Sequence, residues 1–156
     1  MIEIEIPGSG ILKIKYFVMD YNGTLATDGK LIAGLKELLN KLAKYVEIHI
    51  ITADTFGMAG EELKGVNCKL EILPSENQME AKRDYIKKLG KEFCVAFGNG
   101  KNDSLMVKEA KLGISILGEE GTYKDTLMNS NLFFKSIIDA LSFFIEKRRL
   151  IATLRS

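Results

Sequence analysis

Short apolar runs alternate with segments of helical periodicity along most of this chain, and no other feature limits its fold as strongly. Apolar runs that suit buried strands are expected at 17–20, 46–52, 68–73, 93–97, 114–117 and 131–135. Segments with helical spacing are expected at 33–44, 56–64, 77–89, 103–110, 120–129 and from 136 onward. Strands and helices that alternate in this way form right-handed βαβ units around a mostly parallel sheet. The sequence therefore predicts an α/β fold.

The N-terminal segment shows a different pattern. Isoleucines alternate with glutamates over 2–6, and apolar residues alternate with lysines over 12–16. The sequence PGSG, which favours a turn, stands between the two arms. This arrangement predicts a β-hairpin whose acidic and basic side chains face one another across the two strands.

Length and composition favour one domain with an ordinary core. The chain has 156 residues, and no internal repeat, low-complexity tract or linker divides it. We therefore expect residues 1–156 to form a single domain. The closing helix places apolar residues on one stripe and continues into Lys147, Arg148 and Arg149. We expect it to pack on the sheet with a basic last turn that suits the helix dipole, and a partner or membrane surface is the alternative.

Charge and targeting signals argue against several classes of partner. The net charge is +1, which supplies no long-range field to attract nucleic acid or an anionic membrane. No apolar run approaches the ~20 residues of a membrane helix, and the charged N-terminus is unlike a signal peptide. Cys68 and Cys94 form no CxxC pair and are expected to be buried free thiols. The sequence predicts a cytoplasmic protein with neither nucleic acid nor a membrane as its partner.

Polar residues gather where three of the expected strands end. Asp20 closes the first core strand, Thr52 closes the second, and the segment from Asn99 to Asp103 follows the fourth. Ligands of open parallel sheets bind beyond the carboxyl ends of the strands, at the point where the strand order reverses. A single aspartate at a strand end is often only a turn residue. Three such clusters together predict a ligand site.

These segments resemble four motifs of the haloacid dehalogenase (HAD) superfamily. FVMDYNGTL is similar to its first motif, Asp-x-Asp-x-Thr, and HIIT, which ends at Thr52, is similar to its second. Lys82, within MEAKRDYIKKLG, resembles the third motif, and GNGKND resembles the fourth, Gly-Asp-Gly-x-Asn-Asp. The spacing of Lys82 and the segment GNGKNDSLMVKEAKLGISI are also similar to the phosphorylation domain of P-type ATPases. The resemblance covers roughly residues 14–136 and is to uncapped, stand-alone P-type-ATPase-like members.

The resemblance implies a three-layer, Rossmann-like fold and phosphoryl-transfer chemistry. Asp20 would be the nucleophile, forming an aspartyl-phosphate, and Lys82 would supply a positive charge beside it. The implied catalytic residues are Asp20, Asn22, Thr52 and Lys82. The implied phosphate-binding residues are Gly23, Thr24, Thr52, Ala53 and Lys82. The implied ligands of a Mg²⁺ ion are Asp20, Asn22 through its backbone carbonyl, Asn99 and Asp103.

Two asparagines depart from the family pattern. Asn22 stands where many superfamily phosphatases have an acid/base aspartate, whose loss typically costs about 10²–10⁴-fold in rate. Asn99 stands where the fourth motif has a metal-binding aspartate. The first interpretation is therefore a slow Mg²⁺-dependent phosphohydrolase of phosphatase or ATPase type. The alternative is a catalytically impaired member that acts as a phosphate-binding or protein-interaction module.

The sequence leaves no room for a cap domain over this site. About ten residues separate Thr24 from the first helix, and about thirty separate Thr52 from Lys82. An open site predicts either a phosphorylated macromolecule as the substrate, or a phosphorylated small molecule with a neighbouring subunit of a homo-oligomer as the lid. Nothing resembles the separate nucleotide-binding domain of P-type ATPases, which argues against ATP as the natural substrate.

Three other residues invite a functional interpretation that we consider weaker than a structural one. His49 lies in the middle of a strand, where a hydrogen-bonded histidine of the core is expected more often than a catalytic base. Asp54 follows Thr52 and suits a turn or a helix cap at least as well as a role in the site. Cys94 lies in an apolar strand and is expected to be inert.

Overall fold

The computed structural model describes residues 1–54 and 57–156 of the chain. Its centre is a six-stranded sheet in the order β10–β9–β8–β3–β6–β7, in which every neighbouring pair is parallel. The strands are β3 (Tyr16–Asp20), β6 (Glu47–Thr52), β7 (Lys69–Ile72), β8 (Cys94–Gly98), β9 (Leu112–Ile116) and β10 (Leu132–Phe134). The predicted α/β fold with a mostly parallel sheet is confirmed.

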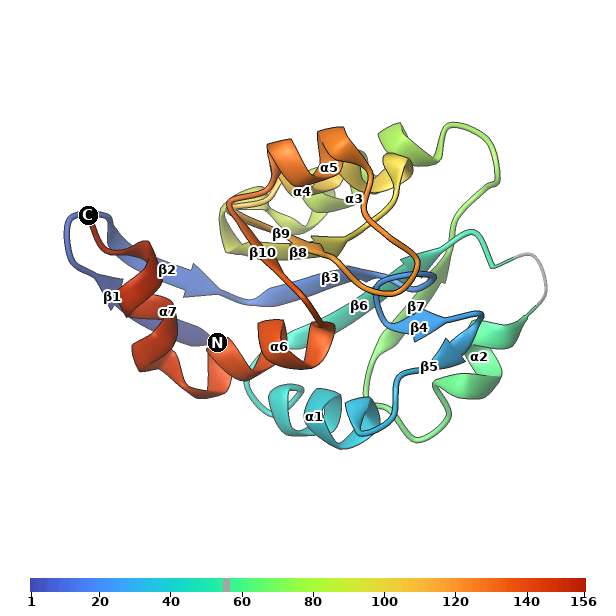
Figure 1. Ribbon diagram of the computed structural model, residues 1–156, viewed down its shortest axis with the longest axis horizontal. Coiled ribbons are helices and arrows are strands. Elements are labelled where there is room, and N and C mark those ends of the chain that lie inside the picture. The colour runs from blue at the N-terminus through green and yellow to red at the C-terminus, as the bar shows by residue number, and fades with distance from the viewer. Residues whose placement is uncertain (55–56) are drawn as a thin grey trace.

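Helices cover both faces of this sheet, giving three layers (Figure 1). One face carries α1 (Leu35–Leu42) and α6 (Ile137–Ile145), and the other carries α3 (Gln78–Leu89), α4 (Ser104–Glu109) and α5 (Lys124–Asn129). β3 shows why, because its apolar run Phe17, Val18 and Met19 has no exposed surface. Phe17 and Met19 belong to the larger core cluster, and Val18 belongs to the smaller cluster on the opposite face. A strand apolar on both faces has to lie between two helical layers.

The N-terminal hairpin is confirmed and lies outside the main sheet. β1 (Ile2–Ile6) pairs antiparallel with β2 (Gly10–Ile14), and Glu3 lies opposite Lys13 with 3.8 Å between the charged groups. The isoleucines of β1 point inward and are buried, while its glutamates are exposed. The helix α7 (Lys147–Leu154) packs on β1 and buries Leu150 completely. The hairpin therefore obtains its own apolar cover from the C-terminal segment (Figure 1).

The expectation of one closing helix with a basic last turn is wrong. The helix is interrupted at Glu146, whose φ of −90° and ψ of 67° are not helical. Lys147, Arg148 and Arg149 therefore lie in the first turn of α7, where the helix dipole does not favour positive charge. The break changes the direction of the chain so that α7 can cover the isoleucines of the hairpin. Burial of that apolar surface outweighs the small electrostatic cost at the exposed first turn.

A second, small hairpin follows β3. β4 (Ala26–Thr27) pairs with β5 (Lys30–Leu31) across the expected turn at Asp28 and Gly29, whose φ values are 51° and 79°. Two left-handed residues in a two-residue loop match the twist of the strands, as Asp-Gly loops usually do. The helix α2 (Met58–Glu62) lies beside β5. Two short 3₁₀ turns, η1 (Lys91–Phe93) and η2 (Lys101–Asp103), flank β8.

The two segments that could have carried a cap contain only these small elements. Between Thr24 and α1 the chain forms the β4–β5 hairpin, and between Thr52 and α3 the residues that the structure describes form α2 and β7. The expected absence of a cap domain is confirmed for these described segments. Over residues 1–54 and 57–156, no helix combines the length and the apolar character that crossing a membrane requires.

Candidate functional site

The candidate site lies at the carboxyl end of β3, the strand at which the order of the sheet reverses. The chain passes from β3 to β6 on one side and later returns to β8 on the other. A cavity of about 320 Å³ opens at this point. Its lining residues are Asp20, Asn22, Thr52, Ala53, Gln78, Asn99, Gly100 and Asn102. The strand ends that the sequence singled out therefore do meet at one pocket.

A buried lysine between two carboxylates forms the base of the site. Lys82 Nζ lies 2.6 Å from Asp20 Oδ1 and 2.7 Å from Asp103 Oδ1. Lys82 is 1% exposed, Asp103 is fully buried and Asp20 is 6% exposed. Hydrogen bonds between two charged groups are shorter and stronger than those between neutral groups, and both contacts of Lys82 have such short distances. When both carboxyl groups are ionised, the group carries one uncompensated negative charge.

Burial and the excess negative charge shift the pKa values of Asp20 and Lys82. Burial raises the pKa of Asp20 to about 7, the charge of Asp103 adds to the shift, and Lys82 opposes it. Burial alone would lower the pKa of Lys82, but the two carboxylates raise it above its ordinary value. Lys82 is therefore protonated at neutral pH. Asp20 is the group of the three whose charge a bound cation would stabilise.

Asp103 lies behind the pocket and fixes the loop after β8. Its Oδ2 accepts hydrogen bonds from the backbone N–H groups of Asn99 and Gly100, both at 3.0 Å. A side chain at Gly98 would not fit, because its Cβ would lie 2.5 Å from the Cβ of Asp103. Asp103 was proposed as a metal ligand from the resemblance. In this arrangement both of its oxygens already have partners, and it does not line the cavity.

Asn99 has a fixed orientation in the site. Its Nδ2 donates to the backbone oxygen of Gly121 at 3.0 Å, and because a carbonyl can only accept, the amide cannot be reversed. Oδ1 therefore faces Thr24, whose hydroxyl donates to it at 3.1 Å. Gly23 makes room for this side chain, since a Cβ at Gly23 would lie 2.3 Å from Nδ2. The amide thus joins the loop after β3 to the loop after β9.

The oxygens of Asp20 and Asn99 could hold a metal ion. The hydroxyl of Thr24 lies 3.4 Å from Asp20 Oδ2 and 3.1 Å from Asn99 Oδ1, and both Asp20 and Asn99 line the cavity. Oxygen donors of this kind suit Mg²⁺, which usually takes one or two carboxylates and completes its shell with water and phosphate. No group of three or more His, Cys, Asp or Glu residues that could hold a metal occurs in the described ranges. The donor set fits Mg²⁺ with one carboxylate rather than two.

The remaining residues implied by the resemblance lie around the same pocket. Thr52, at the end of β6, is 2% exposed and lines the cavity together with Ala53 and Asn22. Gly23 and Thr24, in the loop after β3, line a separate hollow of about 460 Å³. The structure thus brings all nine implied residues to the end of β3, with Lys82 and Asp103 behind the cavity rather than in its wall.

Sequence reasoning assigned no role to three lining residues, Gln78, Gly100 and Asn102. Asn102 Nδ2 donates to Gln78 Oε1 at 2.7 Å, so the two amides form one wall of the cavity. Asn102 belongs to GNGKND, and Gln78 precedes Lys82 by four residues on α3. Because residues four apart share one face of a helix, the position of Lys82 was the signal that could have identified Gln78.

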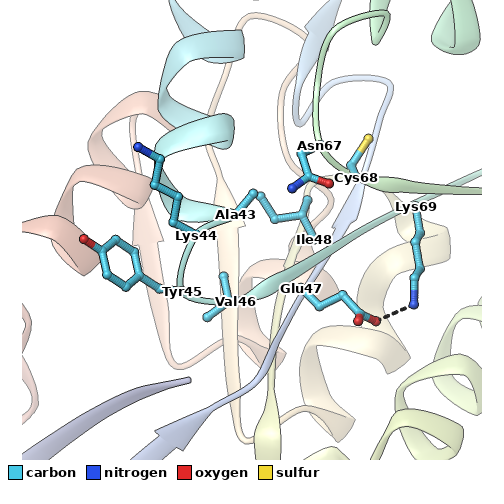
Figure 2. Close-up of a pocket in the computed structure, with 9 residues that line it drawn as sticks. All are labelled: Ala43, Lys44, Tyr45, Val46, Glu47, Ile48, Asn67, Cys68 and Lys69. Atoms are coloured by element: carbon cyan, nitrogen blue, oxygen red, sulfur yellow. Dashed lines mark hydrogen bonds and ion pairs between the residues drawn. The ribbon is translucent and has the colours of Figure 1, made fainter.

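The structural interpretations of the other residues are supported. Both ring nitrogens of His49 have hydrogen-bond partners, and Asp54 Oδ2 accepts from the backbone N–H of Ala59 in the first turn of α2, at 3.0 Å. Cys94 is buried, as expected. Cys68 is only partly buried, so the expectation of two buried thiols is wrong for this residue. It lies at a second hollow, of about 370 Å³, at the amino-terminal ends of β6 and β7 (Figure 2).

Two archaeal proteins resemble parts of the sequence, whereas no protein family model matches it. The uncharacterized protein MJ0073 of Methanocaldococcus jannaschii is 44% identical over 61 residues, which are 39% of this chain and 66% of that protein. The uncharacterized protein MJ0072 of the same organism is 53% identical over 38 residues, which are 24% of this chain and 86% of that protein. The match spans slightly less than two thirds of the first of these relatives.

Solved structures resemble nearly the whole chain. The 3-deoxy-D-manno-octulosonate 8-phosphate (KDO 8-phosphate) phosphatase from Moraxella catarrhalis, in complex with magnesium ion, phosphate ion and KDO, has a TM-score of 0.71 at 20% identity and covers 91% of this chain and 94% of its own. The cobalt-bound phosphatase of the same kind from Haemophilus influenzae has a TM-score of 0.71 at 10% identity, with coverages of 92% and 94%. A protein from Legionella pneumophila described as a HAD subfamily III A hydrolase has a TM-score of 0.72 at 13% identity, with coverages of 91% and 87%. At these identities the likeness establishes the fold.

Proposed function

We propose that this chain, which has the fold of the haloacid dehalogenase superfamily, is a magnesium-dependent phosphohydrolase that works through a phosphorylated Asp20. One observation carries the proposal. At the end of β3, Asp20 faces a cavity while a fully buried lysine holds its other oxygen at 2.6 Å. A carboxylate fixed in this way is placed for attack on an incoming group, and Lys82 is placed to neutralise negative charge that develops there.

The proposed first step forms a phospho-aspartate. A carboxylate oxygen of Asp20 attacks the phosphorus, the bond from phosphorus to the leaving oxygen breaks, and the leaving group departs with that electron pair and takes its proton from water. Thr52 and Ala53, which line the cavity, contact the phosphoryl oxygens during transfer. The backbone N–H of Gly23 already donates to the carbonyl of Ala26 at 2.9 Å, so Gly23 contributes the shape of the loop. Asp20 and Asn99 would hold a Mg²⁺ ion, which would supply positive charge that neutralises the phosphoryl oxygens. The chain's own part is positioning and charge neutralisation.

The second step returns Asp20 by hydrolysis, and we expect it to be slow. Water attacks the phosphorus of the acyl phosphate, the bond to Asp20 breaks, and inorganic phosphate leaves. Asn22, exposed at the cavity, stands where a carboxylate would take the proton from this water. An amide side chain cannot act as a general acid or base at neutral pH. The phosphorylated form should therefore persist, as in the P-type-ATPase-like members that the motifs resemble.

The substrate that we propose is a phosphorylated compound that can enter an open pocket. The cavity has no cap among the described residues, which suits a phosphorylated macromolecule, or a small molecule enclosed by a second subunit of a homo-oligomer. The Moraxella catarrhalis phosphatase, of similar fold, was solved with magnesium, phosphate and a sugar acid. From it we extend to this chain only the substrate class, a phosphorylated small molecule. The sequence is the basis for our further proposal that the chain acts in the cytoplasm, with neither nucleic acid nor a membrane as a partner.

A second candidate function is supported by the two asparagines. Asn22 and Asn99 remove the acid/base group and one metal-binding charge, which is expected of a module that binds phosphate, or a protein partner, without turning over. The intact set of Asp20, Thr52 and Lys82 favours the enzyme.

Beryllium fluoride distinguishes the two candidates, because it forms a phosphoryl analogue only on a reactive carboxylate. In ¹⁹F NMR with Mg²⁺, the wild-type chain should give a bound signal that disappears in Asp20→Asn and after chelation of the metal. Asp84→Asn, on the exposed side of α3, is the matched control and should keep the signal. A wild-type chain with no bound signal, at saturating Mg²⁺, would eliminate the enzyme in favour of the binding module.

A further inference from the structure

His49 is a buried titratable residue that the proposed mechanism does not use. It lies in the middle of β6 and is 2% exposed. Its Nε2 lies 2.7 Å from Oε1 of Glu47, and its Nδ1 lies 2.7 Å from the hydroxyl of Tyr85. Tyr16 of β3 packs edge-on against the same ring. Because Tyr85 belongs to α3, this histidine connects the sheet to the helix that carries Lys82.

The hydrogen bonds of His49 run in one direction. Glu47 also accepts from Lys69 at 2.7 Å, and Figure 2 shows the two side chains reaching toward one another at the rim of the second hollow. The hydrogen bonds from Lys69 and His49 lower the pKa of Glu47, so it is ionised at neutral pH and can only accept. Nε2 of His49 therefore carries the proton, and Nδ1 accepts from the Tyr85 hydroxyl.

The imidazole of His49 is neutral at neutral pH. Burial lowers its pKa, although the hydrogen bond to Glu47 opposes the shift. The charged groups that face it are Glu47 on its own strand and Lys69 and Glu71 on β7, and the tyrosines that face it are Tyr85 on α3 and Tyr16 on β3. A neutral imidazole is the form that can accept from Tyr85, so the bond between sheet and helix is intact at neutral pH.

The positions of the two partners connect this bond to the site. Tyr85 follows Lys82 by three residues on α3, and residues at that spacing lie on one face of a helix. His49 precedes Thr52 by three residues on β6, which pairs directly with β3 and Asp20. The helix α3 packs extensively on α4, which lies on the same face of the sheet. α3 also meets the sheet through buried Ile86, which shares a core cluster with Val18 and Ile51. The Tyr85–His49 bond adds a short polar contact between α3 and β6, one turn away from Lys82.

We propose that the Tyr85–His49 hydrogen bond sets the position of Lys82 against Asp20, so that Tyr85 and His49 are positioning residues of the site. The bond fixes the distance between β6 and the turn of α3 that carries Tyr85. The ammonium of Lys82 is thereby kept within reach of Asp20 and Asp103, at 2.6 and 2.7 Å. The positioning of Lys82 does not depend on the function that we propose. The consequence for phosphoryl transfer rests on the proposed function.

The test is Tyr85→Phe, which removes one oxygen and keeps the ring, with Tyr45→Phe as the control. Tyr45 is 57% exposed at the second hollow, just before β6 begins, and should have no effect. In metal-free Tyr85→Phe, the ¹H–¹⁵N signal of the Lys82 ammonium should shift and exchange faster with water. Affinity for beryllium fluoride with Mg²⁺ should fall about two- to tenfold, the range expected for one hydrogen bond.

A double-mutant cycle with His49→Leu identifies the bond itself as the cause. The double variant should lose no more affinity than the larger single loss, because each change removes the same contact. Additive losses would overturn the proposal. So would a Tyr85→Phe chain that unfolds earlier but keeps the wild-type Lys82 signal and affinity, since the bond would then be structural only. If the wild-type chain binds no beryllium fluoride, the proposed function fails, while the Lys82 signal still decides the positioning role.

Discussion

The ammonium of Lys82 lies 2.6 Å from Oδ1 of Asp20, at the end of the central strand and beneath a cavity of about 320 Å³. Lys82 also lies 2.7 Å from Asp103, so a single buried cation serves two buried carboxylates. This arrangement leaves Asp20 as the group whose charge is least compensated, and Asp20 is also the one of the three that lines the cavity. The structure thereby favours a site that is completed by a cation and an incoming phosphoryl group.

Removing the lysine should destabilise the fold as well as the site. In Lys82→Met, Asp20 and Asp103 would lie together in the interior with no cation between them. We expect the free energy of unfolding to fall by about 3–5 kcal/mol, the usual cost of breaking a buried charge pair. Urea unfolding without metal measures this, with Lys88→Met on the exposed side of the same helix as the control. A loss no larger than that of the control would mean that the charges are not coupled as described.

Asp20 should make the metal-free protein less stable as the pH rises. The pKa of Asp20 is about 7 in the folded chain, against an ordinary value of 3.8. Between these values the folded chain holds a proton that the unfolded chain has released, so stability falls as the pH rises from about 4 to 7.

The variant Asp20→Asn removes this penalty because its side chain is neutral at every pH. At pH 8 without Mg²⁺, we expect it to be more stable than wild type by on the order of 4 kcal/mol, and the two should converge near pH 4. Thermal unfolding across this pH range checks the prediction. If the stability of the two proteins changed with pH in the same way, the raised pKa of Asp20 would be contradicted.

Restoring an acid at position 22 should accelerate turnover without affecting the fold. Asn22 is exposed at the cavity, so Asn22→Asp introduces no buried charge. If the missing acid/base group limits hydrolysis, loss of phosphate from Asp20 should accelerate by about 10²-fold, the lower range for general acid–base catalysis. The decay of the phosphorylated form after removal of the phosphoryl donor measures this rate. An unchanged decay would point to Asn99 and the metal as the limit.

Replacing Asn99 by aspartate should destabilise the metal-free chain. In Asn99→Asp, one carboxylate oxygen would face the carbonyl of Gly121, to which Nδ2 now donates, and the other would face the hydroxyl of Thr24. We expect the metal-free chain to lose about 1–3 kcal/mol of stability, as for an unsatisfied buried polar group. Added Mg²⁺ should recover part of it, which differential scanning calorimetry would detect. Asn67→Asp, at the distant hollow of Figure 2, is the control, and an equally small effect in both variants would refute the fixed role of the amide.

The strand ends could be predicted from the sequence because each follows a continuous apolar run. Asp20, Thr52 and Asn99 could therefore be brought together without knowledge of any contact. The contact between Asn99 and Gly121 could not, because it joins residues 22 apart through an amide and a backbone carbonyl. The requirement for Gly23 beneath Asn99 is of the same kind, since Asn-Gly by itself suggests only a turn.

The C-terminal helices show a different limit of sequence reasoning. The apolar stripe of α6 continues into α7 with nearly unbroken periodicity, so the sequence predicts one helix. The break at Glu146 depends on where the N-terminal hairpin lies, and that hairpin is about 140 residues away along the chain. Local patterning cannot contain this information, because a tertiary contact decides the course of the helix.

The most direct test of the account is to identify the residue that becomes phosphorylated. The chain should be incubated with acetyl phosphate and Mg²⁺, quenched in acid, reduced with borohydride and mapped by mass spectrometry. We predict a single hydroxylamine-sensitive phosphoryl group on Asp20, which requires Mg²⁺ and is absent from Asp20→Asn. Phosphorylation of any other residue, or none in a folded wild-type chain with Mg²⁺ bound, would contradict it.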